Sequence, residues 1–259
     1  MLKEFFTAAL GMQNQLTRLE VIANNIANSN TVGFKRANVF ERNLIDARAN
    51  FYNVKGDVEQ NDPPIGSYYD FSNGAFQKTD NPMDLAIDGE GFFLVEDQEG
   101  KQFLTRNGEF RLSSDGTFIR NDGKILIGEE GPIRISSEFF SNPTITTDGK
   151  AINLRIAQTG EVFLNDTQIG KIVLVVPEDN VDLQRISNGE FIVTGISDIK
   201  YLDFDQVKVR QGWLENSNVD VVSEMVQMIE LQRMFEAGSK VIQTNDSTLD
   251  RSIALGRYY

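Results

Sequence analysis

The sequence predicts an α+β fold in which a mainly antiparallel β domain lies between helical chain ends. All six prolines and 16 of the 21 glycines fall between residues 37 and 211, so turn-forming residues are concentrated in the middle of the chain. At both ends, apolar residues recur at alternating steps of three and four, the heptad pattern of helices packed in a coiled coil. The N- and C-terminal helices are therefore expected to pair as a coiled coil.

The N-terminal helix is predicted to end within residues 28–33, where asparagines and a glycine suit a helix C-terminus. A cleaved signal peptide is not expected, because the apolar run 5–12 is short, is interrupted by Thr7 and follows an acidic Glu4. The predicted apolar seam of this helix consists of Leu2, Phe5, Ala9, Met12, Leu16, Leu19, Ala23 and Ile26.

The middle of the chain is predicted to form short antiparallel strands joined by tight turns. Asn-Gly or Asp-Gly pairs, which supply the positive φ angles of hairpin turns, begin at residues 73, 88, 107, 115, 122, 148 and 188. Strand-like runs lie between them at about the spacing of an antiparallel domain. These runs cover residues 92–95, 102–105, 109–112, 117–120, 125–127, 171–176 (a predicted central strand), 190–194 and 206–210.

A second long helix is predicted at the C-terminal end, opened by a capping box of Ser217 and Asp220. A second apolar stripe, Val222, Val226 and Ile229, widens its apolar face. The predicted seam contains Val221, Met225, Met228, Phe235, Ile242, Leu249 and Ile253. The predicted divisions are an N-terminal helix (1–36), an extended connector (37–69), the β domain (70–205), and a return strand with the C-terminal helix (206–259).

Composition excludes several classes of function. With 25 Lys+Arg and 38 Asp+Glu the net charge is 25 − 38 = −13, which disfavours binding to nucleic acid or to an anionic membrane surface. The chain contains no cysteine and no histidine, so thiolate nucleophiles, imidazole bases and zinc sites with nitrogen or sulfur ligands are excluded. No segment reaches the length of about 18 apolar residues that a membrane span requires, and no direct membrane insertion is expected.

The remaining chemical motifs are weak. Gly89 and Gly91 form a Gly-x-Gly that precedes a strand-like run rather than a helix, so dinucleotide binding is disfavoured. Carboxylates are plentiful, but nothing in the sequence selects the facing pair that a glycosidase needs. A carbohydrate-active enzyme and an extracellular β-rich binding or adhesion module remain as alternative functions.

Three segments resemble the flagellar basal-body rod and hook proteins. Residues 21–36 read Val-Ile-Ala-Asn-Asn-Ile-Ala-Asn-Ser-Asn-Thr-Val-Gly-Phe-Lys-Arg and are similar to the N-terminal motif of that family. Residues 70–93 with 104–108, and residues 211–233, resemble its middle and C-terminal motifs in the same order. The residues that carry the N-terminal motif are Asn24, Asn25, Asn28, Gly33 and Phe34.

The resemblance implies a structural axial subunit of the bacterial flagellum, without enzymatic activity or cofactor. In this family the terminal helices form an inner coiled-coil tube around an export channel, and the β domain lies outside it. The implied partners are other rod and axial proteins, copies of the same chain, and the flagellar type III export apparatus. The implied location is the rod in the cell envelope, reached without a cleaved signal peptide.

The resemblance favours a rod protein of the proximal type over the distal type. Residues 44–69 contain only Gly56 and Gly66 and lack the Gly-rich insertion expected of the distal-rod member. Residues 128–133 and 233–244 look more like the proximal-rod member that adjoins it. The distal rod subunit is the alternative within the same family.

Overall fold

The computed structural model describes residues 2–41, 65–135, 154–165, 167–177, 183–186, 189–192, 199–202 and 207–256. The chain divides into two compact units. The helical unit contains residues 1–28, 36–70 and 219–259, and the β unit contains residues 29–35 and 71–218. Residues 29–35 thus belong to the β unit, although the chain on both sides of them belongs to the helical unit.

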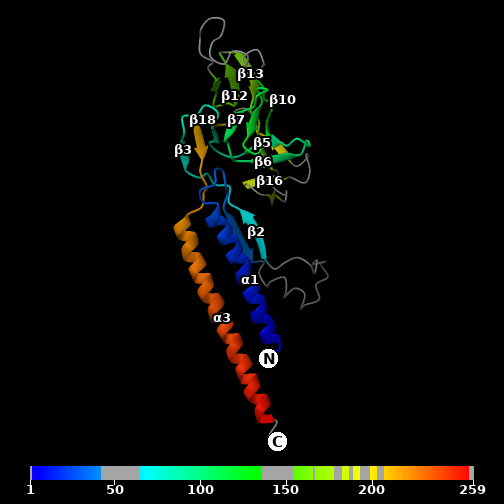
Figure 1. Cartoon of the computed structure of the whole chain (residues 1–259), viewed down its shortest axis with the longest axis vertical. Helices are drawn as coiled ribbons and strands as arrows, with labels where there is room; N and C mark the ends of the chain where they lie inside the picture. Colours follow the sequence, from blue (N-terminus) through cyan, green and yellow to red (C-terminus); the bar gives the residue numbers. More distant parts are fainter. Residues whose placement is uncertain are drawn as a thin grey trace. The chain divides into compact units, whose positions relative to one another are not determined.

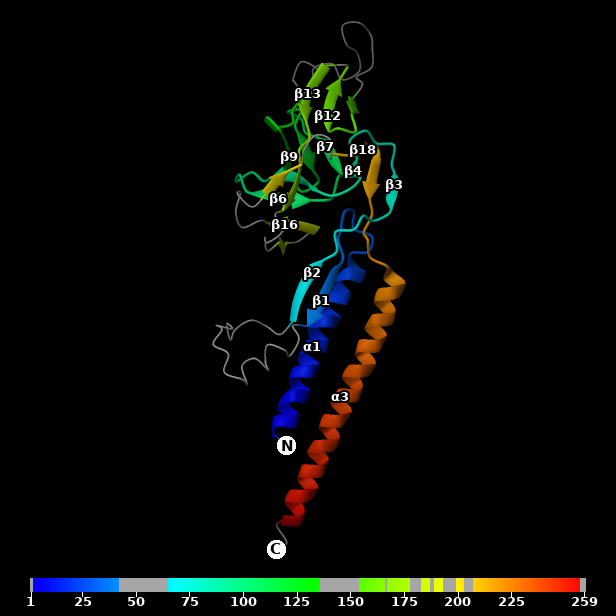
Figure 2. The ribbon, with the colours of Figure 1, turned by 180° about the vertical axis from the view of Figure 1, so that it is seen from behind.

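The helical unit pairs two long helices with a two-stranded sheet. Helices α1 (Leu2–Ala27) and α3 (Val221–Gly256) lie side by side in both views (Figures 1 and 2). Strands β1 (Ala37–Glu41) and β2 (Ile65–Tyr69) pair in antiparallel register beside α1. At 1.5 Å per residue, the 26 residues of α1 span about 39 Å and the 36 residues of α3 about 54 Å.

Local side-chain hydrogen bonds define the helix ends. The Asn28 side chain donates to the Asn24 carbonyl at 2.8 Å, where α1 ends. Asp220 Oδ1 accepts the backbone N–H groups of Val222 and Ser223 at 3.0 and 3.4 Å, so Asp220 is the N-cap of α3. The predicted capping box is wrong in this respect, since Asp220 rather than Ser217 satisfies the first free amides.

The β unit is built from antiparallel strands. Its largest sheet runs in the order β15-β16-β6-β5-β9-β8-β7, with β10 paired to β9 and with β14 between β5 and β17. Smaller sheets are β11-β12-β13, β18-β4 and β19-β3. The strands are β3 (Phe76–Lys78), β4 (Leu85–Ile87), β5 (Phe92–Glu96), β6 (Gln102–Thr105), β7 (Phe110–Leu112), β8 (Phe118–Arg120), β9 (Ile125–Gly128), β10 (Gly131–Pro132), β11 (Leu154–Ile156), β12 (Glu161–Leu164), β13 (Thr167–Lys171), β14 (Leu174–Pro177), β15 (Gln184–Arg185), β16 (Glu190–Ile192), β17 (Ile199–Tyr201), β18 (Val209–Gln211) and β19 (Trp213–Glu215).

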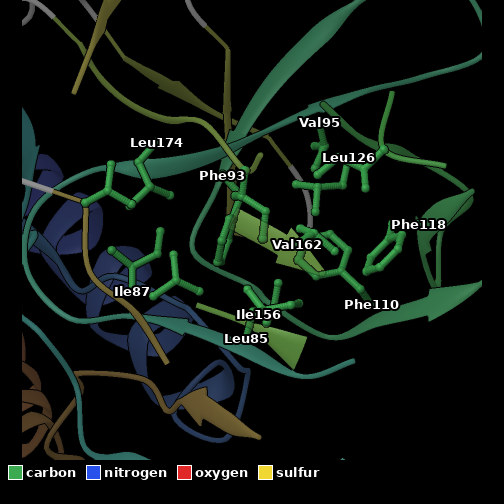
Figure 3. Close-up of a cluster of buried hydrophobic side chains, with 14 of the residues drawn as sticks. Leu85, Ile87, Phe93, Val95, Phe110, Phe118, Leu126, Ile156, Val162 and Leu174 are labelled. Carbon is green, nitrogen blue, oxygen red and sulfur yellow. The ribbon is translucent and has the colours of Figure 1, made fainter. Parts of the chain in front are cut away.

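One apolar core holds the β unit together. Figure 3 shows side chains from several strands, including Phe93, Leu126 and Val162, converging on a common interior. Phe93 and Phe110 meet edge to face with ring centroids 5.5 Å apart, a geometry that aromatic pairs favour. The strands that contribute this core come from residues 85–209, so the β unit has its own interior.

The predicted α+β class with mainly antiparallel strands is confirmed, with two local differences. The single central strand predicted over residues 171–176 is wrong: β13 ends at Lys171 and β14 begins at Leu174, because Ile172 bridges to Gly128 instead of continuing either ladder. Residues 37–41 and 65–69, predicted as parts of an extended connector, form the paired strands β1 and β2. None of the described helices combines the length and apolarity needed to cross a membrane.

Candidate assembly interface

The apolar seam predicted on α1 coincides only in part with the face by which α1 packs in its own unit. Among the α1 side chains that the structure describes, Ile22 and Asn25 are buried. Of the predicted seam, Leu16 is 46% exposed, Ala23 is exposed, and Met12, Leu19 and Ile26 are half-buried. The side chains of Leu2, Phe5 and Ala9 lie outside the described part. The seam is therefore rotated around α1 from the buried positions Ile22 and Asn25, and it leaves Leu16 and Ala23 exposed.

Helix α3 also separates a packed face from an open one. Glu224 and Leu231 are buried, and Val221, Met228, Phe235 and Ile242 of the predicted seam are half-buried on the same side. The packed face thus steps through residues 221, 224, 228, 231, 235, 238 and 242. Gly238 lies against Met12 of α1, and a Cβ there would come 3.5 Å from Met12 Cγ. The side chains of Leu249 and Ile253 lie outside the described part.

The open side of α3 carries a stripe of exposed apolar residues, which we call the α3 stripe. Its members are 48% to 71% exposed: Val222, Met225, Val226 and Ile229. They fall within two turns of one helix face, because residues three and four apart are neighbours on a helix surface. Among them, Met225 was predicted as part of the seam, and the other three form the second stripe predicted from the sequence.

A buried polar cluster joins the start of β1 to both helices. The Asn25 side chain, 1% exposed, donates to the Ala37 carbonyl at 2.9 Å and accepts the Ala37 N–H at 3.0 Å. It also donates to Glu224 Oε2 at 3.2 Å, and Arg36 Nε pairs with Glu224 Oε1 at 2.6 Å. Asn25 therefore holds β1 against α1 and orients the Glu224 carboxylate, so this motif residue has a structural role.

We expect Asn25→Asp to destabilise the helical unit by about 2 kcal/mol or more. The change removes two hydrogen-bond donations and places a second carboxylate beside Glu224, which leaves buried polar groups unsatisfied. Thermal unfolding followed by the helical circular dichroism signal measures the effect. Asn24→Asp is the matched control, because the Asn24 side chain is exposed; equal stabilities of the two variants would contradict the role assigned to Asn25.

Two further motif residues, Gly33 and Phe34, lie inside the β unit. Gly33 adopts a φ of +69°, and a Cβ there would lie 2.4 Å from the backbone carbon of Arg106. The Gly33 N–H donates to the Glu215 carbonyl at 2.7 Å. Phe34 is 2% exposed, with the Arg185 guanidinium 4.3 Å from its ring centroid. Residues 29–35 thus complete the β unit, which explains why a glycine and an aromatic residue stand at these positions.

Lys35, Arg106 and Glu215 form a buried charge cluster, which we call the Glu215 cluster. Lys35 Nζ lies 2.6 Å from Glu215 Oε1 and Arg106 Nη1 lies 3.3 Å from Glu215 Oε2, and each side chain is 1% exposed. Lys35 also donates to the carbonyls of Ser72 and Phe71 at 2.8 and 3.3 Å. Burial lowers the pKa of the Arg106 guanidinium, and the nearby Glu215 carboxylate opposes that shift.

A second charge cluster in the β unit surrounds Glu190. Arg120 and Lys124 both lie 2.7 Å from the buried Glu190 carboxylate, and Lys124 also lies 3.0 Å from Asp122. Burial lowers the pKa of Lys124, but its hydrogen bonds to Glu190 and Asp122 outweigh this and the pKa is raised. Burial raises the pKa of Asp122, but the hydrogen bond from Lys124 and the charge of Arg120 leave the pKa below its usual value.

We expect Lys124→Met to destabilise the β unit by about 1.5–3 kcal/mol near neutral pH, the range for hydrogen bonds to charged groups. Because the pKa of Lys124 is raised in the folded state, its interactions contribute stability below the unfolded pKa of about 10.4, and this contribution is lost as the pH rises through the folded pKa. Because the pKa of Asp122 is lowered, its interactions contribute stability above the unfolded pKa of about 3.9, and this contribution is lost as the pH falls through the folded pKa. The difference from wild type should therefore be largest between about pH 4 and pH 10 and shrink outside it.

Denaturant unfolding across this pH range measures the effect. Lys101→Met is the matched control, since Lys101 also approaches the Phe103 ring, at 5.6 Å against 4.6 Å for Lys124, but is exposed. If Lys124→Met lowers the free energy of unfolding equally at low, neutral and high pH, the charged interactions assigned to Lys124 are wrong.

Sequence reasoning did not single out the side chains of these clusters. Lys35, Arg106, Glu215 and Glu224 lie within segments that were matched to the family motifs, but no periodicity marks a buried charge. For Lys35 and Glu215 the available signal was their position close to Gly33, Phe34 and Trp213 in the sequence. Among the residues that the structure describes, no group of three or more Asp or Glu side chains could hold a metal ion.

Three family descriptions match the chain. Residues 6–35 match "Flagella basal body rod protein", residues 86–164 match "Flagellar hook protein FlgE/F/G D1 domain", and residues 210–255 match "Flagellar basal body rod FlgEFG protein C-terminal". The first and third segments cover most of α1 and α3, and the second covers much of the apolar core of the β unit.

Curated relatives match over nearly the whole chain. Flagellar basal-body rod protein FlgG of Bacillus subtilis is 33% identical over 99% of this chain and 100% of its own length. FlgG of Agrobacterium fabrum is 31% identical over 92% of this chain and 94% of its own. Flagellar basal-body rod protein FlgF of Caulobacter vibrioides is 29% identical over 94% of both chains.

Proposed function

The chain belongs to the flagellar basal-body rod protein family, and we propose that it polymerises through α1 and α3 to help form the hollow rod of the flagellar basal body. The family is structural, and its relatives are named as rod proteins. The observation that carries the proposal is the open apolar surface on both helices. On α3 the four residues of the α3 stripe remain exposed beside the packed face, and on α1 Leu16 is 46% exposed.

The open faces favour contacts with neighbouring subunits over a purely internal role. Leu16 on α1 and the α3 stripe expose large aliphatic side chains on long helices, and contiguous exposed apolar surface marks interaction sites. Leu16 and Met225 belong to the predicted heptad seams and are exposed, and heptad spacing suits knobs-into-holes packing, so the proposed partner is a helix of a neighbouring subunit. When a surface of this kind meets a different surface on the next copy and the rotation between copies does not close a ring, the contact repeats and gives a helical filament.

The proposal extends to partners and location. The partners are copies of this chain together with other rod and axial proteins, and the helices form the coiled-coil wall of the channel through the rod. Export by the flagellar type III apparatus, without a cleaved signal peptide, would deliver the subunit to the rod in the cell envelope. The absence of cysteine fits a chain that is exported and refolded without disulfide formation.

The comparisons support an FlgG-like rod protein without distinguishing proximal from distal type. Relatives named FlgG and FlgF match with similar identity, 33% and 29%, over nearly the whole chain. The expectation of a proximal-rod subunit, drawn from residues 128–133 and 233–244, stays a prediction.

Deletion of residues 2–27 tests the proposed function against the alternative of an adhesion module. This deletion removes α1 but keeps residues 29–35, which complete the β unit. A rod subunit should lose incorporation into purified basal bodies, as seen by immunoelectron microscopy, while Trp213 fluorescence reports an intact β unit. Normal incorporation of the shortened chain would overturn the proposal.

A further inference from the structure

Most of the sulfur-containing side chains of this protein lie on its helices. It has no cysteine and six methionines, of which Met12 lies on α1 and Met225, Met228 and Met234 lie on α3. Met225 and Met234 are each 48% exposed, whereas Met12, Met83 and Met228 are half-buried. Because oxidation of methionine follows exposure, and no thiol of this chain can react first, these two thioethers are the accessible redox groups of the described residues.

Met225 lies within the α3 stripe. Val222, Val226 and Ile229 are its neighbours along the open face, within one turn of the helix. Met234 is equally exposed on the same helix, but it lines a groove of about 250 Å³ beside Val21, Ile22 and Leu231 of the helical unit. The two methionines are thus equally exposed and lie on the same helix. They differ because Met225 belongs to the α3 stripe, whereas Met234 lines the groove.

We propose that Met225 is an oxidation site whose conversion to the sulfoxide blocks assembly of the free subunit. The inference rests on the proposed function, since it requires the α3 stripe to be covered by a neighbouring subunit in the rod. Once covered, the sulfur is shielded from oxidant, so the modification selects against damaged subunits before assembly and leaves assembled ones untouched.

The oxidant is a peroxide, with hydrogen peroxide as the simplest case. The thioether sulfur of Met225 attacks one peroxide oxygen, the S–O bond forms as the O–O bond breaks, and sulfur loses two electrons. The departing oxygen takes the proton of the transferred hydroxyl and leaves as water, so the peroxide is reduced and atoms balance. The product replaces an apolar thioether by a polar S=O group, which the α3 stripe offers no polar side chain to satisfy.

Peptide mapping of the full-length chain after brief exposure to hydrogen peroxide is the first test. Each sulfoxide adds one oxygen, about 16 Da, to its peptide. Met225 and Met234 should be modified before Met12, Met83 and Met228 in the free subunit, and Met225 should be protected in assembled filaments. Modification of Met225 at the rate of the half-buried methionines, or without protection in filaments, overturns the proposal.

The second test compares assembly of the full-length chain by sedimentation and electron microscopy. Oxidation should raise the critical concentration of wild type and of Met234→Leu roughly tenfold, which corresponds to about 1.4 kcal/mol. Met225→Leu should assemble equally well before and after peroxide, and Met225→Gln should assemble poorly without any oxidant.

The outcomes distinguish failure of the proposed function from failure of the proposed oxidation site. If untreated wild type fails to assemble under all conditions, the proposed function fails and this inference with it. If untreated wild type assembles and oxidised wild type assembles equally well, or if Met225→Leu gives no protection, the oxidation site is overturned while the proposed function stands.

Discussion

Glu215→Gln is expected to unfold the β unit at room temperature or bring it close to unfolding. The variant leaves the ammonium of Lys35 and the guanidinium of Arg106, each 1% exposed, without a carboxylate between them. Breaking a buried pair by removing one partner costs about 3–5 kcal/mol, against a total stability of about 5–15 kcal/mol for a typical domain. The loss is expected to be large because one carboxylate serves two cations and also accepts the Gly74 N–H at 2.9 Å.

Unfolding of the β unit can be followed through the fluorescence of Trp213. It is the only tryptophan of the chain and lies in β19, two residues before Glu215, so its fluorescence follows unfolding of the β unit in denaturant. Glu99→Gln is the control, because it makes the same chemical change on an exposed residue of the same unit. The double variant Glu215→Leu, Lys35→Met should recover part of the loss, since it removes one of the stranded cations.

A Glu215→Gln variant with the unfolding midpoint of wild type would show that water or another group satisfies both cations. Equal midpoints for Glu215→Gln and Glu99→Gln would mean that the ion pair between Lys35 and Glu215 does not hold residues 29–35 in the β unit.

The sequence could predict the helices and most of the strands because both depend on regular apolar periodicity and on turn residues. The run at 125–127, for example, became β9, which pairs with β8 across the turn at Asp122 and Gly123. The predicted strand over 171–176 failed because an uninterrupted apolar run does not reveal where its pairing partner changes. Apolar periodicity could not locate the end of one strand and the start of the next here, because the apolar run continues across the break.

The candidate interface was predicted only in part. Heptad spacing identified Leu16 and Met225 as apolar helix positions, but it could not tell a face packed within one chain from a face left open. That distinction depends on Ile22, Glu224 and Leu231, whose burial is set by how α1, β1 and α3 meet. The burial of a glutamate in the packed face of α3 depends on Asn25 and Arg36, which come from the far end of the sequence, and no local pattern encodes it.

Leu16→Asp is expected to abolish rod assembly and motility while leaving the fold of the single chain intact. Leu16 is 46% exposed in the helical unit, so a carboxylate there stays hydrated in the free subunit and stability should change little. In the proposed rod the same carboxylate would be buried in an apolar seam without a partner, which costs several kcal/mol. Since about 1.4 kcal/mol is a factor of ten, subunit affinity should fall at least about 100-fold at every repeated contact.

Gln13→Asp is the matched control, because it adds the same charge to an exposed polar position one turn earlier on α1. Motility and basal-body assembly should be compared for the two variants at equal cellular protein level, with circular dichroism of each purified chain to verify the fold. The pairing of an unchanged fold with lost assembly is the decisive result, because a merely structural leucine would lower stability instead. If Leu16→Asp cells build normal rods, the open face of α1 is not an assembly surface, and the role proposed for that helix is wrong.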